Sequence, residues 1–327
     1  MENSMLYLAL LFISWSGTYC IRKIALKKSL LAIPNERSSH SVPTPHGGGI
    51  AIALTWLLGL IYLFMHDRID ATLFYALLIG FGISIVSFLD DMYELTAKTR
   101  LCAQALVSAV GLYLLGGLSS IDFGFFILQN PWITNALAFF GIIWFINLYN
   151  FLDGIDGYAG MEAVFLAFSG GVLLGGGHFI VLAVSVFGFL VWNWHKAKIF
   201  MGDVGSTLLG YTIAIFALYY QNNGTSIFVW LILFGLFWFD ATLTLVRRYR
   251  NHESLSMAHR KHAYQRAVQS GLTHAHVVLS GLAVNTILFI LSYSAFSNPK
   301  IILGIFCFAI VFLYAVVYWV DKRRKFE

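Results

Sequence analysis

Long apolar segments recur from one end of this chain to the other, and they restrict its fold more than any other feature. The chain has 327 residues, of which 59% are hydrophobic and 11% are charged, whereas a soluble domain carries about 25% charged residues. Runs of roughly 17–25 apolar residues match the length that a helix needs to cross a bilayer. Because these runs do not alternate with polar residues, they predict helices.

The sequence therefore predicts an all-α, polytopic membrane bundle of about eleven spanning helices. It forms a single domain over residues 1–327. The connecting gaps are too short for a separate soluble catalytic domain, so the bundle and its loops must carry the chemistry. The expected spans lie at about 5–21, 47–65, 71–89, 101–117, 135–150, 159–175, 178–194, 206–221, 226–245, 276–294 and 301–320.

Lysine and arginine residues fall almost entirely in alternate gaps between these segments. Of the 21, only Arg68 and Lys300 lie in the other set of gaps. The positive-inside rule makes the basic side cytoplasmic, so we expect the N-terminus outside and the C-terminus in the cytoplasm. The net charge of +5 is spread between spans and forms no basic stripe. We therefore expect no nucleic-acid partner.

The third predicted span ends in two adjacent carboxylates, Asp90 and Asp91. If both lie on a helix, their side chains diverge by about 100°, so one of the two faces a given site. Adjacent carboxylates at a membrane edge need solvent or a cation. The pair indicates either a charged site on the predicted cytoplasmic side or a solvated turn.

A second polar motif ends the fifth predicted span. It places an oxygen-bearing side chain at every third position, which would align them along one helix face; these are Asn147, Asn150, Asp153 and Asp156. Hard oxygen ligands suit Mg²⁺, which binds through one or two carboxylates plus substrate phosphates. Helix caps and interhelical hydrogen bonds are the structural alternative for the same residues.

Asp203 stands between two glycines, Gly202 and Gly205, just before the eighth predicted span. This position predicts a helix N-terminus, where backbone N–H groups favour a carboxylate or a phosphate. Lys196 and Lys198 precede it and add positive charge. The segment predicts a phosphate and metal site, with a plain helix cap at Asp203 as the alternative.

Two further loops on the same predicted side carry basic and small residues. The first, which includes Arg37 and Gly48, offers hydroxyl groups and a run of glycines. The longest loop carries His259, Arg260 and His262. These side chains suit phosphate contacts, and the alternative is a basic loop that lies on anionic lipid headgroups.

Asp240 lies inside the ninth predicted span, one to two turns before Arg247. A carboxylate within a membrane segment usually faces a polar interior and has a partner. An ion pair with Arg247 and a catalytic role are both consistent with this position.

Four motifs together resemble a known family over residues 34–266. They read R-S-S-H…P-T-P-x-G-G-G, D-D, N-x-x-N-x-x-D-G-x-D-G and I-F-M-G-D-x-G-S. In combination they are similar to the polyprenyl-phosphate N-acetylhexosamine-1-phosphate transferases, which are relatives of the phospho-MurNAc-pentapeptide transferase. The last loop reads H-R-x-H-A-Y-Q. It is more similar to the transferases that start O-antigen or related surface polysaccharides than to the peptidoglycan enzyme with its triple-histidine run.

The resemblance implies transfer of a sugar-1-phosphate from a UDP-N-acetylsugar to undecaprenyl phosphate with release of UMP. It also implies Mg²⁺, with Mn²⁺ as an alternative, and a bacterial inner membrane with the active site on the cytoplasmic face. The implied loops span about 22–46, 90–100, 150–158, 195–205 and 246–275. A homodimer is left open.

The resemblance assigns roles residue by residue. The implied catalytic residues are Asp90, Asp91, Asp153, Asp156, His259 and His262. The implied metal ligands are Asp203 and Asp153. The predicted substrate-binding residues are Asn150, Asn193, Lys98, Arg260, Arg37 and Gly48.

Two positions depart from the family pattern, and three different functions stay open. Lys196 stands where the family often has proline, and His46 stands where it often has arginine. A transporter or proton-coupled carrier would explain Asp240 and the polar helix faces. The sequence is also compatible with a peptidoglycan phospho-MurNAc-pentapeptide transferase and with an inactive scaffold for polysaccharide assembly.

Overall fold

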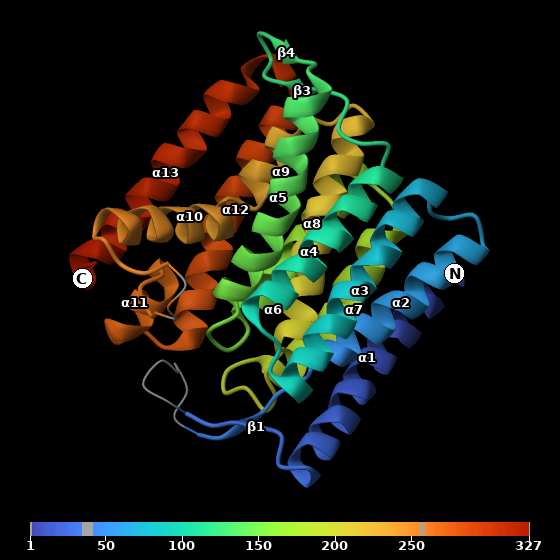
Figure 1. Ribbon diagram of the computed structural model, residues 1–327, viewed down its shortest axis with the longest axis vertical. Coiled ribbons are helices and arrows are strands. Elements are labelled where there is room, and N and C mark those ends of the chain that lie inside the picture. Colours follow the sequence, from blue (N-terminus) through green and yellow to red (C-terminus); the bar gives the residue numbers. More distant parts are fainter. Residues whose placement is uncertain (1, 35–41, 256, 258, 327) are drawn as a thin grey trace.

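The computed structural model describes residues 2–34, 42–255, 257 and 259–326, and these form a helical bundle (Figure 1). Ten of the predicted spans are each a single helix. They are α1 (Glu2–Lys27), α2 (Gly49–Met65), α3 (Ala71–Tyr93), α4 (Ala97–Leu114), α5 (Pro131–Leu152), α6 (Tyr158–Leu174), α7 (Gly177–Asn193), α8 (Asp203–Asn222), α12 (His274–Ser297) and α13 (Ile302–Arg323).

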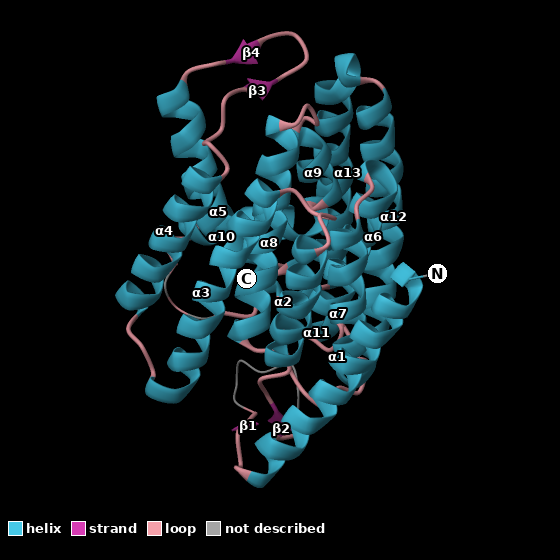
Figure 2. Ribbon diagram, turned by 90° about the vertical axis from the view of Figure 1, so that its right-hand side faces the viewer, coloured by secondary structure: helices cyan, strands magenta, loops and turns pink. Residues whose placement is uncertain are grey.

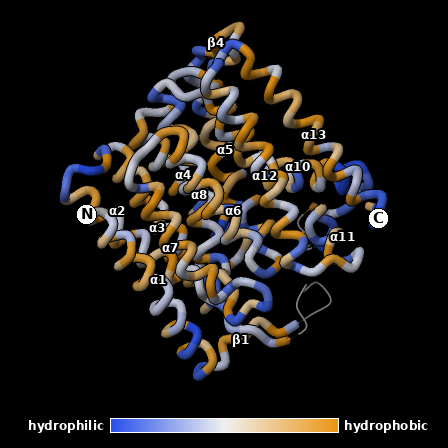
Figure 3. The backbone as a smooth tube through the Cα atoms, turned by 180° about the vertical axis from the view of Figure 1, so that it is seen from behind, coloured by the Kyte–Doolittle hydropathy of each residue, from blue (hydrophilic) through white to orange (hydrophobic). Residues whose placement is uncertain are grey.

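The bundle has the composition of a membrane protein. Within the described residues, 5 helices are long and apolar enough to cross a bilayer, and a bent pair raises the number to 6. Hydrophobic residues cover most of the helices, while hydrophilic segments gather near the C-terminus and in loops (Figure 3). The chain is an all-α membrane protein. The predicted number of spans and the predicted orientation of the termini stay predictions.

The prediction that the ninth span is a single helix is wrong. It consists of α9 (Ile227–Leu233) and α10 (Gly235–Arg250), which meet at an angle of 79°. The break lies at Gly235, where an added Cβ would come within 2.9 Å of Leu313 Cδ1 on α13. The apolar run continues through this point without a proline, and a single glycine within such a run is also compatible with an unbroken helix.

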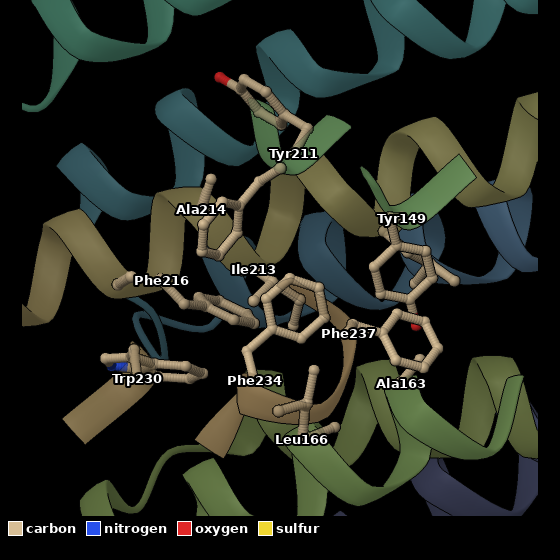
Figure 4. Packing of buried hydrophobic residues seen from close by; sticks show 14 of the residues in the cluster. Tyr149, Ala163, Leu166, Tyr211, Ile213, Ala214, Phe216, Trp230, Phe234 and Phe237 are labelled. Carbon is tan, nitrogen blue, oxygen red and sulfur yellow. The ribbon is translucent and has the colours of Figure 1, made fainter. Parts of the chain in front are cut away.

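Helix α8 forms the centre of the bundle and packs against α3 and α5. Most of its residues are buried, and many of them are small or weakly polar. Small residues allow helix backbones to approach closely, and a Cβ at Gly210 would lie 2.5 Å from Phe145 O of α5. The ring of Phe216 on α8 and the rings of Trp230 and Phe234 form part of a continuous aromatic core (Figure 4).

Four short strands and two short helices complete the described part of the chain. β1 (Leu31–Ala32) pairs with β2 (Thr44–Pro45), and β3 (Ile121–Asp122) pairs with β4 (Ile127–Leu128), both antiparallel. The two hairpins lie at opposite ends of the bundle (Figure 2). The short helices are α11 (Ala263–Gln269) and the 3₁₀ turn η1 (Pro299–Ile301).

Candidate active site

A polar cavity of about 470 Å³ opens where several helices end. It lies at the end of the bundle that carries β1, opposite the β3–β4 hairpin (Figure 1). Its lining comes from helix ends, a strand and loops that are far apart in the sequence: Ala32, His46, Asp91, Asn150, Asp153, Gly154, Ile155, Asp156, Asn193, Phe200, Gly202, Asp203, Gln265 and His274.

Asp203 is the first residue of α8, as the sequence predicts. Its carboxylate Oδ2 accepts a hydrogen bond of 3.2 Å from Asn150 Nδ2. Ser206 Oγ in turn donates to Asn150 Oδ1 over 2.7 Å, which fixes the orientation of the carboxamide. The end of α5 and the start of α8 are therefore joined through polar side chains at the cavity wall.

Asp153 directly follows the last residue of α5 and lines the same cavity. Within the described part of the chain, no side chain or backbone N–H donates a hydrogen bond to its carboxylate. Burial, and next the neighbouring Asp203 carboxylate, raise the pKa of Asp153 well above its usual range. Two close carboxylates favour a cation between them, because like charges repel in a partly desolvated site.

The two adjacent acids of α3 point in different directions, as their helical spacing predicts. Asp91 lines the cavity, and its Oδ2 lies 3.9 Å from His46 Nδ1. Asp90 accepts hydrogen bonds from the Leu95 backbone N–H at 2.7 Å and from Arg100 Nη1 at 2.9 Å. Asp90 thus stabilises the turn between α3 and α4, while Asp91 faces the site.

Asp156 lies between two histidines. Its Oδ2 is 2.9 Å from His195 Nδ1 and 3.2 Å from His274 Nδ1, and it accepts a 3.2 Å bond from the Ala197 N–H. Burial alone would raise the pKa of Asp156, but the hydrogen bonds from His274 and His195 outweigh it and lower that pKa. Asp156 therefore gives the cavity a negatively charged carboxylate whose position is fixed by its three partners.

The glycine-rich loop before α2 is tied to the segment before α8. Gly48 N–H donates to Phe200 O at 2.9 Å, and Gly49 N–H donates to Met201 O at 2.8 Å. A Cβ at Gly49 would lie 2.3 Å from the Gly205 backbone nitrogen. Only glycine allows this approach, and it brings His46 to the cavity.

Comparison with known proteins identifies the family of this chain. The model of glycosyl transferase family 4 matches residues 73–221. A probable undecaprenyl-phosphate N-acetylglucosaminyl 1-phosphate transferase of Bacillus subtilis (strain 168) is 31% identical over 293 residues, which cover 85% of this chain and 80% of the relative. The chain belongs to the polyprenyl-phosphate hexosamine-1-phosphate transferases.

Two other relatives of this transferase carry similar names. A decaprenyl-phosphate N-acetylglucosaminephosphotransferase of Mycobacterium tuberculosis (strain ATCC 25618 / H37Rv) is 30% identical over 346 residues, with 91% of this chain and 84% of the relative covered. An undecaprenyl-phosphate alpha-N-acetylglucosaminyl 1-phosphate transferase of Yersinia pestis is 27% identical, with 84% and 78% covered. The transferase is thus an enzyme that transfers a glycosyl-1-phosphate group, which sets aside the transporter and the scaffold.

The structure of the transferase divides the predicted site residues into two groups. The first group lines the cavity and consists of Asp91, Asn150, Asp153, Asp156, Asn193 and Asp203. The second group lies outside its lining and consists of Asp90, Lys98, Gly48, His259, Arg260 and His262. Arg37 lies outside the described residues.

The predicted histidines of the long loop, His259 and His262, do not line the cavity. His262 is buried, with Nδ1 3.7 Å from Asp240 Oδ1. The His259 ring is 4.8 Å from the His262 ring, and burial, reinforced by His262, lowers the pKa of His259 to about 4. From this part of the transferase, Gln265 and His274 reach the cavity lining instead.

Of the two alternatives for Asp240, the ion pair with Arg247 is wrong. Asp240 accepts hydrogen bonds from the backbone N–H groups of Ala263, at 2.8 Å, and Tyr264, at 3.3 Å. Arg247 instead makes a 2.9 Å ion pair with Asp321 of α13. The reason is that the first turn of α11 lies beside Asp240 and offers it two backbone N–H groups.

The predicted alignment of four polar residues on one helix is also wrong. α5 ends at Leu152, so Asp153 and Asp156 lie in the following turn. Asn147 lies on the helix but exchanges hydrogen bonds of 2.7 and 3.3 Å with Gln104 of α4. Glycine is needed at position 154 of this turn for space, because an added Cβ would clash with Tyr264 Oη.

Sequence reasoning missed two residues that contact Asp156. His195 lies within the polar motif that precedes α8, and its position near Asn193 was the available signal. His274 lies 118 residues from Asp156 in the sequence and has no local signal. Asn193 is positioned as well, because its Oδ1 accepts a 2.9 Å bond from the Gly157 N–H.

Proposed function

We propose that this transferase moves an N-acetylhexosamine-1-phosphate group from a UDP-sugar to undecaprenyl phosphate. UMP leaves, and undecaprenyl-diphosphate-sugar remains. The names of the relatives support a polyprenyl-phosphate acceptor and an N-acetylglucosamine-type sugar. The observation that carries the proposal is the convergence of Asp91, Asp153 and Asp203 on one cavity in a bundle of apolar helices.

The donor set of this cavity fits Mg²⁺, with Mn²⁺ as an alternative. Asp153 and Asp203 offer hard oxygen atoms, which this class of ion prefers. The Asp153 carboxylate has no hydrogen-bond donor in the described part of the chain and lies close to a like charge. We assign the ion to Asp203 and Asp153. When bound, it would neutralise the charge of the donor diphosphate and of the leaving UMP.

The proposed reaction is a direct displacement at phosphorus. An oxygen of the lipid phosphate forms a bond to the β-phosphorus of the UDP-sugar, and the bond from that phosphorus to the oxygen bridging the α-phosphate breaks. Asp91 holds the proton of the lipid phosphate, because it faces the cavity beside His46. Asp90 supports it through the turn that it fixes with Arg100. One diphosphate replaces another, so the reaction is reversible.

The remaining cavity residues suit the donor. Asn150 and Asn193 hold the pyrophosphate and nucleotide part, while Asp156 and His274 form the wall next to them. The acidic loops lie at the same end as β1, which we assign to the cytoplasmic side of the bacterial inner membrane. The H-R-x-H-A-Y-Q loop supports a transferase that initiates O-antigen or another surface polysaccharide.

A donor panel tests the proposal. Purified transferase is incubated with undecaprenyl phosphate, Mg²⁺ and each of several UDP-N-acetylsugars, and both UMP and the lipid product are identified by mass spectrometry. We expect equal amounts of UMP and lipid-diphosphate-sugar with at least one N-acetylhexosamine donor. Release of UDP, with the sugar joined to the lipid through a single phosphate, would contradict it. A panel in which only UDP-MurNAc-pentapeptide reacts would favour the peptidoglycan enzyme.

A further inference from the structure

A second cavity of about 440 Å³, separate from the acidic site, lies where the C-terminal ends of α10 and α13 meet. The two ends lie side by side near the C-terminus (Figure 1). Its lining shares no residue with the candidate active site and consists of Arg247, Arg250, Asn251, Asp321, Lys325 and Phe326. The proposed reaction therefore assigns no role to this second cavity.

The second cavity has a surplus of positive charge. Its single lining carboxylate, Asp321, pairs with Arg247 at 2.9 Å and also with Arg266 of α11. Arg250 and Lys325 are exposed, and no ion pair joins either one to a carboxylate in the described part of the chain. Two cations thus stay available to an anion from outside.

The aromatic ring of Phe326 lies close to several of these positively charged side chains. The guanidinium carbons of Arg247 and Arg266 lie 5.3 and 5.4 Å from the centre of its ring. Lys261 Nζ lies 5.7 Å from the same centre. Cations stack favourably over an aromatic face, so the arrangement holds several positive side chains close together in spite of their repulsion.

The side chains at the end of α13, beside this cavity, are of the kinds found where a membrane meets water. Helix α13 is long and apolar enough to span a bilayer. Its last turns expose Tyr318, by 52%, and Trp319, by 47%. Lys322 Nζ lies 4.9 Å above the first ring and the Arg323 guanidinium 4.2 Å above the second. Exposed tyrosine and tryptophan beside basic residues mark the headgroup region.

We propose that this cavity binds the headgroup phosphate of an anionic phospholipid. Arg250 and Lys325 contact the phosphate, and the acyl chains lie along the exposed apolar face of α13. Basic pockets between membrane helices suit lipid phosphates, and hydrogen bonds between a cation and a phosphate are among the strong ones. Because Asp321 joins α10, α11 and α13, the bound lipid stabilises the region that supports the long loop.

Lipid binding to the purified transferase in neutral detergent tests this inference. Native mass spectrometry with added phosphatidylglycerol or phosphatidylcholine gives the affinity for each. We expect phosphatidylglycerol to bind and phosphatidylcholine not to bind. The double variant Arg250→Gln/Lys325→Gln should bind phosphatidylglycerol about 30-fold more weakly, since each surface cation contributes about 1 kcal/mol.

The matched control is Lys322→Gln/Arg323→Gln, which also removes two positive charges, here from the last turn of α13 and outside the cavity lining. It should weaken binding by no more than about threefold. An equal loss in both double variants would overturn the proposal in favour of general attraction to charge. Inorganic phosphate that displaces the lipid at equal concentration would overturn it in favour of a free-anion site. Unchanged thermal unfolding of both variants without lipid checks that each is folded.

Discussion

Asn150 Nδ2 donates a 3.2 Å hydrogen bond to Asp203 Oδ2, across 53 residues of sequence. The same carboxamide accepts a 2.7 Å bond from Ser206 Oγ. Because both contacts use one amide group, the side chain of Asn150 cannot turn without breaking one of them. The orientation of the Asp203 carboxylate is thus determined by a residue at the end of a different helix.

Replacing Asn150 with alanine should raise the Mg²⁺ concentration that half-maximal turnover requires. Loss of a residue that orients a metal ligand costs about 10- to 100-fold in metal affinity. Titration of UMP release with Mg²⁺ measures this effect. The control is Asn147→Ala on the same helix, because Asn147 bonds to Gln104 outside the cavity. A similar shift in both variants would mean that α5 as a whole had been disturbed.

Asp203→Asn keeps the size of the side chain but removes its charge. We expect turnover to fall by about 10²- to 10³-fold, as when one electrostatic contact to a reacting group is lost, and the Mg²⁺ titration curve to flatten. Steady-state rates over a range of Mg²⁺ concentrations give the answer. An unchanged Mg²⁺ titration would remove Asp203 from the proposed metal site.

Asp90 and Asp91 should respond differently to the same change. Asp91→Asn should lower turnover by about 10²-fold or more, because a group that handles a proton is lost, and should leave the unfolding temperature unchanged. Asp90→Asn weakens the pair with the 45% exposed Arg100, so it should lower the free energy of unfolding by about 0.5–1 kcal/mol. Activity and thermal unfolding are measured for both variants. The opposite pattern would reassign the two acids.

Gly49→Ala should destabilise the transferase. The added Cβ would lie 2.3 Å from the backbone nitrogen of Gly205, and such overpacking costs about 1–3 kcal/mol. The control is Gly304→Ala in α13, where no atom lies within 4 Å of the added Cβ. Thermal unfolding in detergent should show a loss for Gly49→Ala and no loss for Gly304→Ala. Equal behaviour would mean that the loop before α2 can move away from α8.

Stability should fall in mild acid because of His259. Its folded-state pKa of about 4 lies below the ordinary value of 6.5, so the unfolded chain binds a proton first as the pH falls through that range. His259→Gln should reduce the loss of stability between about pH 7 and pH 5 by about 1 kcal/mol, a value discounted for partial exposure of the ring. Unfolding temperatures at both pH values test this. The control is His276→Gln on the exposed side of α12, which should lose as much stability between the two pH values as the unchanged transferase does.

The local pattern of apolar residues was sufficient to predict where most of the helices lie. Continuous apolar runs predict helices because each one satisfies its own backbone in lipid, and no distant contact is needed for that. The start of α8 at Asp203 and the divergence of Asp90 from Asp91 also follow from local geometry. The break between α9 and α10 does not, because a single glycine in an apolar run is also compatible with a continuous helix.

The amino-acid sequence by itself determined the class of protein, the positions of the helices and most of the acids that reach the cavity. Tertiary structure alone decided the partners: His274 reaches Asp156 over 118 residues, and Arg247 pairs with Asp321 over 74. The physical reason is the separation in sequence over which each interaction acts. Helix formation depends on neighbours within a few residues, whereas charge pairing depends on which helix ends the packed bundle brings together.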